Sequence, residues 1–126
     1  MRYALLAALA VSLLPAQTKK IVFMGGTPDQ IADYQAVTSK ARIVAASGAE
    51  VMKEIADADA IIGVPRAEHI RAAKKLQWVQ TRSAGVENVL HLSGGNDLRD
   101  SKIILTNNQI VQGPEIAELQ AHGSVL

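Results

Sequence analysis

Residues 20–30 read KIVFMGGTPDQ, and the rest of the chain repeats the pattern of this stretch. Its first five residues form a mostly apolar run that stops at two glycines, which is typical of a buried β-strand. The next four residues combine a side chain that can cap a helix, a proline, an acid and an amide that can bond back to the cap; they are Thr27, Pro28, Asp29 and Gln30. Ile31, Tyr34 and Val37 follow at helical spacing. The stretch therefore predicts a strand, a turn and a helix.

The alternation of strand and helix continues along the chain. Apolar runs predict further strands at 41–45, 58–64, 77–81 and 102–106. The helices are predicted from a capping box at 47–50, from apolar stripes at residues 70, 73 and 76 and at residues 86, 89 and 90, and from a Gly-Pro start at 113–115. Such alternation implies parallel strands with right-handed crossovers, and strands that are apolar throughout imply a sheet covered on both faces. We expect an α/β fold: a flavodoxin-like five-stranded parallel sheet with helices on both faces.

Length and composition limit the classes of function. The 126 residues suffice for one α/β domain, and 48% hydrophobic with 20% charged residues is typical of a globular chain. The formal net charge is +1 and no run of Lys or Arg exceeds two residues, so we expect no nucleic-acid partner. Without cysteine there is no disulfide, no thiolate metal site and no cysteine nucleophile.

Residues 1–16 (MRYALLAALAVSLLPA) have the layout of a secretory signal peptide. Arg2 precedes eleven residues of which only Ser12 is polar, and Pro15-Ala16 ends the run. This run is shorter than the about 20 residues that cross a bilayer, so we expect no membrane span in the mature chain. A signal peptide implies export to the periplasm or the outside. The alternative is an N-terminal core helix in a cytoplasmic protein.

Ligands of open parallel sheets bind at the carboxyl ends of the strands, which here precede the loops at 24–27, 64–66, 81–86 and 106–111. The strongest candidate is the turn Arg82-Ser83-Ala84-Gly85-Val86. Small residues let a ligand approach its backbone, and amides at a helix start suit a carboxylate or a phosphate. The alternative is a tight strand-to-helix turn that needs glycine at its fourth residue.

Other polar residues are weaker candidates. Arg66 could pair with an anion or be solvated, and Asn107 could bind a ligand or belong to an Asn-rich turn. His69 and His91 are expected at helix surfaces, and Trp78 in the core or between domains. The sequence contains no G-x-G-x-x-G fingerprint, no Walker loop, no H-x-x-x-H pair and no G-x-S-x-G elbow. We therefore predict no catalytic residue in this chain.

Four segments together resemble the D-isomer-specific 2-hydroxyacid dehydrogenases. They read ADAIIG at 58–63, LQWVQTRSAGVEN at 76–88, ILTN at 104–107 and GPEIAE at 113–118. The resemblance is to the catalytic, substrate-binding domain of that family and covers residues 19–118. The SAGVEN turn followed by TN and then GPEIAE is fairly specific in that order.

The resemblance implies a two-domain enzyme with a flavodoxin-like and a Rossmann half. NAD or NADP binds the Rossmann half of the complete family member, which interconverts a 2-hydroxy acid and a 2-oxo acid and is in some cases a homodimer. The carboxylate of the acid is held by backbone amides of the turn that matches Ala84 and Gly85. We extend this substrate-binding site to Arg82, Ser83 and Asn107. The family's catalytic Arg, Glu and His belong to its later part, which nothing here matches.

Residues 119–126 (LQAHGSVL) depart from the family pattern, and we do not assign His122 a catalytic role. We expect a truncated dehydrogenase: the substrate half alone, without its own cofactor site and inactive by itself. Two alternatives remain, namely a stand-alone exported module that binds small carboxylates, and one half of a split enzyme.

Overall fold

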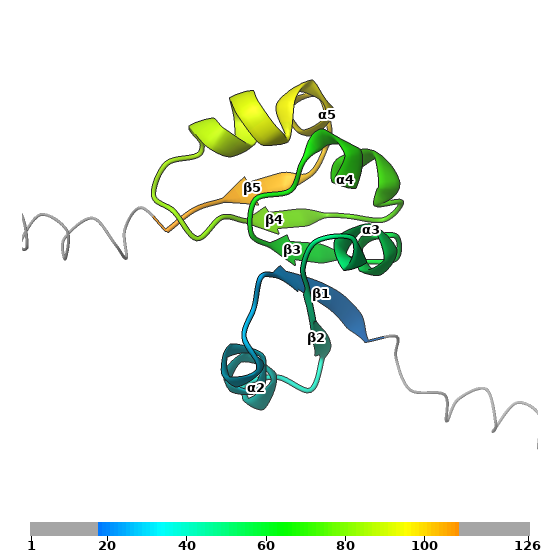
Figure 1. Ribbon diagram of the computed structural model, residues 1–126, viewed down its shortest axis with the longest axis vertical. Helices are drawn as coiled ribbons and strands as arrows, with labels where there is room; N and C mark the ends of the chain where they lie inside the picture. The colour runs from blue at the N-terminus through cyan, green and yellow to red at the C-terminus, as the bar shows by residue number, and fades with distance from the viewer. Residues whose placement is uncertain (1–17, 109–126) are drawn as a thin grey trace, which may run out of the picture.

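Five parallel strands form one sheet in the order β2-β1-β3-β4-β5 (Figure 1) in the computed structural model, which describes residues 18–108. The strands are β1 (Lys19–Met24), β2 (Ala41–Ala46), β3 (Ala60–Ile62), β4 (Trp78–Gln80) and β5 (Ile104–Thr106). This confirms the predicted flavodoxin-like sheet. The last three strands are shorter than predicted because β3, β4 and β5 pair over only three residues each. Gly63 ends β3 with a φ of 140°, which favours glycine.

Helices lie on both faces of the sheet. They are α2 (Pro28–Ala36), α3 (Glu50–Ile55), α4 (Ala67–Ala72), a π-helix η1 (Asn88–Ser93) and α5 (Gly95–Arg99). Val22 joins the core formed with α3, whereas its neighbour Phe23 meets Tyr34 of α2 with ring centroids 5.4 Å apart. Because adjacent strand residues point to opposite faces, α2 and α3 cover opposite faces of β1. Figure 1 shows α2 at the β2 end of the sheet and α5 at the β5 end.

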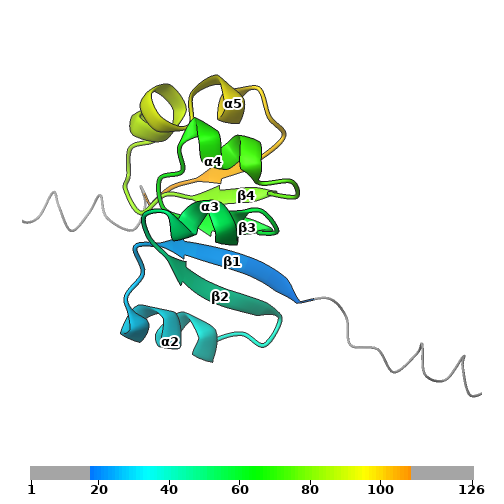
Figure 2. The same ribbon diagram turned by 45° about the vertical axis from the view of Figure 1, so that its right-hand side comes forward.

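The main core lies between the sheet and the helices that follow β2, β3 and β4, and Figure 2 shows α3 and α4 along this side. It consists of buried side chains from strands and helices: Val22, Ala46, Val51, Ile55, Ala58, Ile61, Ile70, Leu76, Val79, Val89 and Leu98. Ile70, Leu76 and Val89 do lie in this core, but α4 ends at Ala72, so the helix predicted to carry residues 70, 73 and 76 is too long. Burial of this continuous apolar set is the main source of the domain's stability.

One predicted helix start is confirmed and another is wrong. Thr27 Oγ1 accepts a hydrogen bond from the Gln30 N–H (3.3 Å), and Gln30 Oε1 accepts one from the Thr27 N–H (3.0 Å). The capping box at 47–50 does not form, because Gly48 adopts a left-handed φ of 56° and α3 begins only after Ala49. The helix predicted to carry Val86, Val89 and Leu90 is a π-helix, η1, that begins at Asn88 and in which the Gly94 N–H donates to the Val89 carbonyl five residues earlier.

Two aromatic side chains depart from their predicted positions. His69 is buried, with 7% of its surface exposed, rather than at a helix surface. Trp78 is 38% exposed, because Val79 faces the main core and its neighbour must point to the opposite face. On that face Ile104, the register partner of Trp78, is also exposed. A core position for Trp78 is therefore wrong.

Several predictions lie outside the described residues: the leader at 1–16, the helix start at 113–115 and the tail at 119–126. Among residues 18–108, no helix is long and apolar enough to cross a membrane.

Candidate functional site

The loops after β1, β3, β4 and β5 lie along one edge of the sheet, as the parallel register requires. Phe23 pairs with Ile62, Ile62 with Gln80, and Gln80 with Thr106, so these strands end side by side. The strand order reverses between β1 and β3, and this topological switch point is where open α/β sheets bind ligands. The described parts of all four candidate loops are thus at the expected edge.

Side chains within the turn after β4 hold its own carbonyl groups. Thr81, which is fully buried, donates from Oγ1 to the Ser83 carbonyl oxygen over 3.1 Å. Ser83 Oγ donates in turn to the Gly85 carbonyl oxygen over 2.7 Å. Ser83, a predicted ligand-binding residue, therefore uses its hydroxyl proton to shape the turn.

Residues that follow β5 also donate hydrogen bonds to carbonyls of this turn. Asn107 Nδ2 donates to the Ala84 carbonyl oxygen (2.6 Å), and the Asn108 N–H donates to the Ser83 carbonyl oxygen (3.1 Å). Gln80 Nε2 donates to Asn108 Oδ1 over 2.8 Å and so orients that side chain. The structure thus brings the predicted residue Asn107 directly against the predicted turn.

With its carbonyls taken, the turn leaves backbone donors unused. Within residues 18–108, the N–H groups of Ala84 and Gly85 donate no hydrogen bond. Gly85 is exposed and Ala84 is half-buried, so these donors lie at an accessible surface. Adjacent unpaired amides of this kind bind anions.

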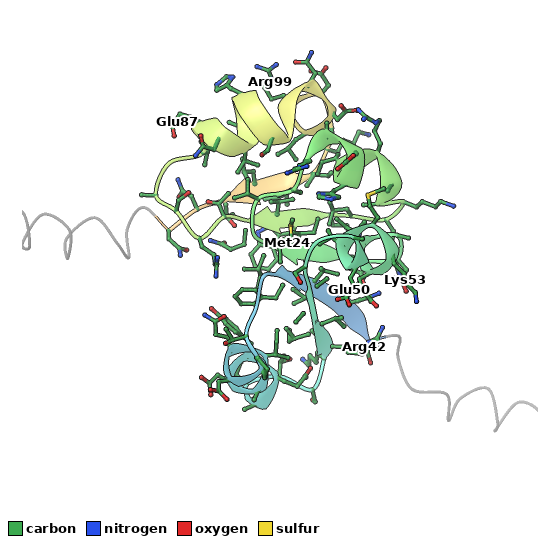
Figure 3. The ribbon with its side chains drawn as sticks, viewed as in Figure 1. Met24, Arg42, Glu50, Lys53, Glu87 and Arg99 are labelled. Atoms are coloured by element: carbon green, nitrogen blue, oxygen red, sulfur yellow. The ribbon has the colours of Figure 1, made fainter. Side chains whose placement is uncertain are left out.

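Two charged side chains flank the turn. The Arg82 guanidinium carbon lies 5.5 Å from the centroid of the Phe23 ring, a distance suited to a cation–π contact. Glu87 is labelled in Figure 3 beside the helical segment that follows the turn. Its carboxylate lies next to Gly85, in the space that a Cβ on Gly85 would occupy. An anionic ligand at the turn would therefore be attracted by Arg82 and repelled by Glu87.

The loop after β1 does not fit a dinucleotide cofactor. The loop after β1 has only Gly25-Gly26 in place of the G-x-G-x-x-G fingerprint, and a Cβ on Gly26 would lie 2.9 Å from the Phe23 ring. The Gln30 N–H at the start of α2 is already bonded to Thr27 Oγ1, so it is not available to a pyrophosphate. No group of three or more His, Cys, Asp or Glu that could hold a metal occurs in the part of the chain described by the structure.

The remaining sequence candidates lie elsewhere. His91 is exposed and its Nδ1 lies 3.1 Å from an Arg99 nitrogen. His69 Nδ1 accepts the Arg66 N–H (3.0 Å) at the start of α4. His69 follows Arg66 by three residues, as Gln30 follows Thr27. This spacing was the sequence signal from which a cap by His69 at the start of α4 could have been predicted.

The tightest charge cluster occupies the opposite edge of the sheet and is structural. Buried Lys20 Nζ lies 2.6 Å from Asp57 Oδ1 and 2.9 Å from Glu54 Oε2, and the Lys20 N–H donates to Asp59 Oδ2 over 2.8 Å. Burial opposes the charge of Lys20, but its two carboxylate partners outweigh burial and raise its pKa. The hydrogen bond to Lys20 lowers the pKa of both Asp57 and Glu54.

Comparisons with known proteins add no assignment: neither a scan against protein-family models nor a search of curated proteins finds a match to this chain.

Proposed function

We propose that this chain binds the carboxylate of a small 2-hydroxy or 2-oxo acid at the turn 82–86. Such binding is the task of the substrate-binding domain in the D-isomer-specific 2-hydroxyacid dehydrogenases, which the sequence resembles. The observation that carries the proposal is the turn itself, in which carbonyl groups are bonded inward while the N–H groups of Ala84 and Gly85 have no described acceptor.

Each residue of the turn has a distinct part in this proposal. The Ala84 and Gly85 amides donate to the two carboxylate oxygens of the acid, and Arg82 adds a cation at the same edge of the sheet. Asn107 is a positioning residue, because its hydrogen bond to the Ala84 carbonyl sets the direction of the adjoining peptide.

A complete dehydrogenase would take its hydride from NAD(P)H or give it to NAD(P)⁺. The loop after β1 does not suit that cofactor, and we propose that another domain supplies it. We expect the chain alone to bind acids weakly, because the turn lies on an open surface and most ligand sites enclose their ligand. We also expect the chain alone to be catalytically inert.

The direct test is a titration of the ¹⁵N-labelled protein with pyruvate and D-lactate, followed by NMR. We expect amide shifts at residues 83–86 that saturate at millimolar concentrations. Gly85→Val, which puts a branched side chain beside the Gly85 N–H in the space that the flexible Glu87 carboxylate now takes, should weaken them. Ser83→Ala, which removes only the hydroxyl bond to the Gly85 carbonyl, should weaken binding less. Binding that is unchanged in Gly85→Val would refute the site, and oxidation of NAD(P)H by the pure chain with pyruvate would refute its inertness.

Export of the chain through residues 1–16 remains a separate proposal. N-terminal sequencing of the protein from the periplasm or medium should find a start at Gln17. Soluble NAD(P) pools are cytoplasmic, so an exported form would favour the stand-alone carboxylate-binding module. A cytoplasmic protein that keeps Met1 would favour the dehydrogenase half and contradict the signal peptide.

A further inference from the structure

A cavity of about 480 Å³ lies on the α3 and α4 side of the switch point. Its walls combine apolar residues, among them Met24, Val51, Met52 and Val64, with three polar side chains, those of Arg66, Glu68 and His69. None of these residues belongs to the turn 82–86. Figure 3 shows Met24 in the middle of the molecule at the end of β1. Gly63 packs so closely against it that a Cβ on Gly63 would lie 2.8 Å from Met24 Cβ.

The apolar wall of this cavity is unusually accessible. Met52 and Val64 are among the few large hydrophobic side chains of the described residues that remain exposed, at 42% and 43%. They come from α3 and from the loop after β3, two segments that meet at this cavity. Exposed apolar side chains that gather around a concavity mark ligand sites more often than isolated ones do.

His69 provides a hydrogen-bond donor in this wall. Its side chain is more than nine-tenths buried, and its Nδ1 accepts the Arg66 N–H over 3.0 Å. Nδ1 therefore carries no proton, and Nε2 carries the proton of the neutral ring. Burial lowers the pKa of His69, which keeps the ring neutral near pH 7. A metal would need Nε2 without its proton, so this tautomer suits a ligand that accepts a hydrogen bond.

The position of Glu68 indicates which acceptor fits. Its Oε1 lies 3.9 Å from His69 Nε2 and 4.0 Å from the nearer Arg66 nitrogen. Both distances are too long for a hydrogen bond. A carboxylate oxygen of the protein thus already lies near both His69 Nε2 and the Arg66 guanidinium, without a hydrogen bond to either. Because Glu68 is half exposed, it can swing into water and leave this position to a ligand carboxylate.

We propose that this cavity binds a short aliphatic carboxylate, with its hydrocarbon against Met24, Met52 and Val64 and its carboxylate between His69 Nε2 and Arg66. The site is separate from the turn 82–86 and needs no oxygen on the 2-carbon of the acid.

The test uses the full chain with ¹³C-methyl methionine and ¹⁵N labels, titrated with 3-methylbutanoate. We expect shifts of the Met24 and Met52 methyl signals and of the amides of residues 64–69. Acetate lacks most of the hydrocarbon and 3-methylbutanamide lacks the charge. Each should bind at least about tenfold more weakly than 3-methylbutanoate. Shifts confined to residues 83–86, or no shifts, would overturn this second site; the first result would leave the turn site intact.

Variants separate the donor from its structural role. His69→Phe should weaken binding about tenfold, since a buried donor to a charged group is lost. His69→Gln should bind 3-methylbutanoate about as well as the wild type. Its amide can accept the Arg66 N–H, as Gln30 accepts that of Thr27, and can still donate to the ligand. Equal binding by His69→Phe and the wild type would contradict the proposal.

Two further variants do not alter the buried ring. Arg66→Ala should weaken binding of 3-methylbutanoate but not of its amide, and Glu68→Ala should strengthen binding of the acid. His91→Phe, an exposed histidine outside the cavity, is the matched control and should bind as the wild type does. Failure of both Arg66→Ala and Glu68→Ala to change the affinity would refute the assigned carboxylate position.

Discussion

Asn107 donates a hydrogen bond of 2.6 Å from its side-chain amide to the carbonyl oxygen of Ala84, 23 residues earlier in the chain. The bond joins the end of β5 to the turn after β4, at the edge of the sheet where ligands are expected. It orients the Ala84 carbonyl inward, and the next N–H group, that of Gly85, then has no acceptor among the described residues.

Asn107→Ala should therefore loosen the turn and reduce its affinity for pyruvate about three- to tenfold. The loss of one partly buried hydrogen bond should also lower the free energy of unfolding by about 1 kcal/mol. Urea unfolding and the NMR titration measure the two effects. Asn88→Ala is a suitable control, since the Asn88 side chain is exposed and makes no hydrogen bond within residues 18–108; only the backbone carbonyl of Asn88 accepts the Ser93 hydroxyl. Equal losses of affinity in the two variants would contradict a specific role for Asn107.

Glu87→Gln should increase the affinity of the turn for carboxylates roughly two- to fivefold, the effect of removing one exposed like charge worth about 0.5–1 kcal/mol. The reason is that the Glu87 carboxylate lies against Gly85 and repels an anion there. The gain should shrink at high salt. Asp33→Asn, on the exposed side of α2, should leave the affinity unchanged. A loss of affinity in Glu87→Gln would mean that Glu87 supports the bound acid instead.

Ile61→Ala should lower the free energy of unfolding by about 2–5 kcal/mol, because Ile61 is fully buried between the sheet and the helices that follow it. Ile104→Ala is the matched control: this side chain is 64% exposed, so its truncation should cost about 0.5 kcal/mol or less. Chemical denaturation of both variants measures the difference. Similar costs would mean that the β4–β5 face is covered in solution.

The Lys20 cluster should make stability depend on pH at both ends of the scale. The lowered pKa values of Glu54 and Asp57 stabilise the fold above their unfolded values of about 4.5 and 3.8, and this contribution is lost as the pH falls through the lower folded values. The raised pKa of Lys20 stabilises the fold below its unfolded value of 10.5 and loses its effect as the pH rises through the higher folded value. In Lys20→Met both slopes should flatten.

Thermal unfolding as a function of pH measures these slopes. Lys53→Met on α3, whose side chain makes no ion pair within residues 18–108, should keep the wild-type slopes. Unchanged slopes in Lys20→Met would show that other groups govern the acid and alkaline limits.

Local signals in the sequence were enough to predict the sheet and the start of α2. The apolar run at 20–24 and the cap at Thr27 act within a few residues of each other, so they need no knowledge of the rest of the fold. The same local reasoning failed at Ser47, because the left-handed backbone of Gly48 moves the helix start beyond reach of that side chain.

Long-range features could not be predicted from spacing. The contact of Asn107 with Ala84 depends on the β4–β5 register, and the burial of His69 depends on how the loop after β3 leads into α4. The exposure of Trp78 likewise follows from which face of the sheet each helix covers. The turn itself was found from its small residues, but the direction of its N–H groups became apparent only from the bonds made by its carbonyls.

The central claim is that the N–H groups of Ala84 and Gly85 bind a carboxylate, and the ¹⁵N NMR titration with pyruvate tests it most directly. The account predicts saturable shifts of the amides of residues 83–86, with a weaker affinity in Gly85→Val. A wild-type spectrum in which these amides do not move at millimolar pyruvate would contradict it.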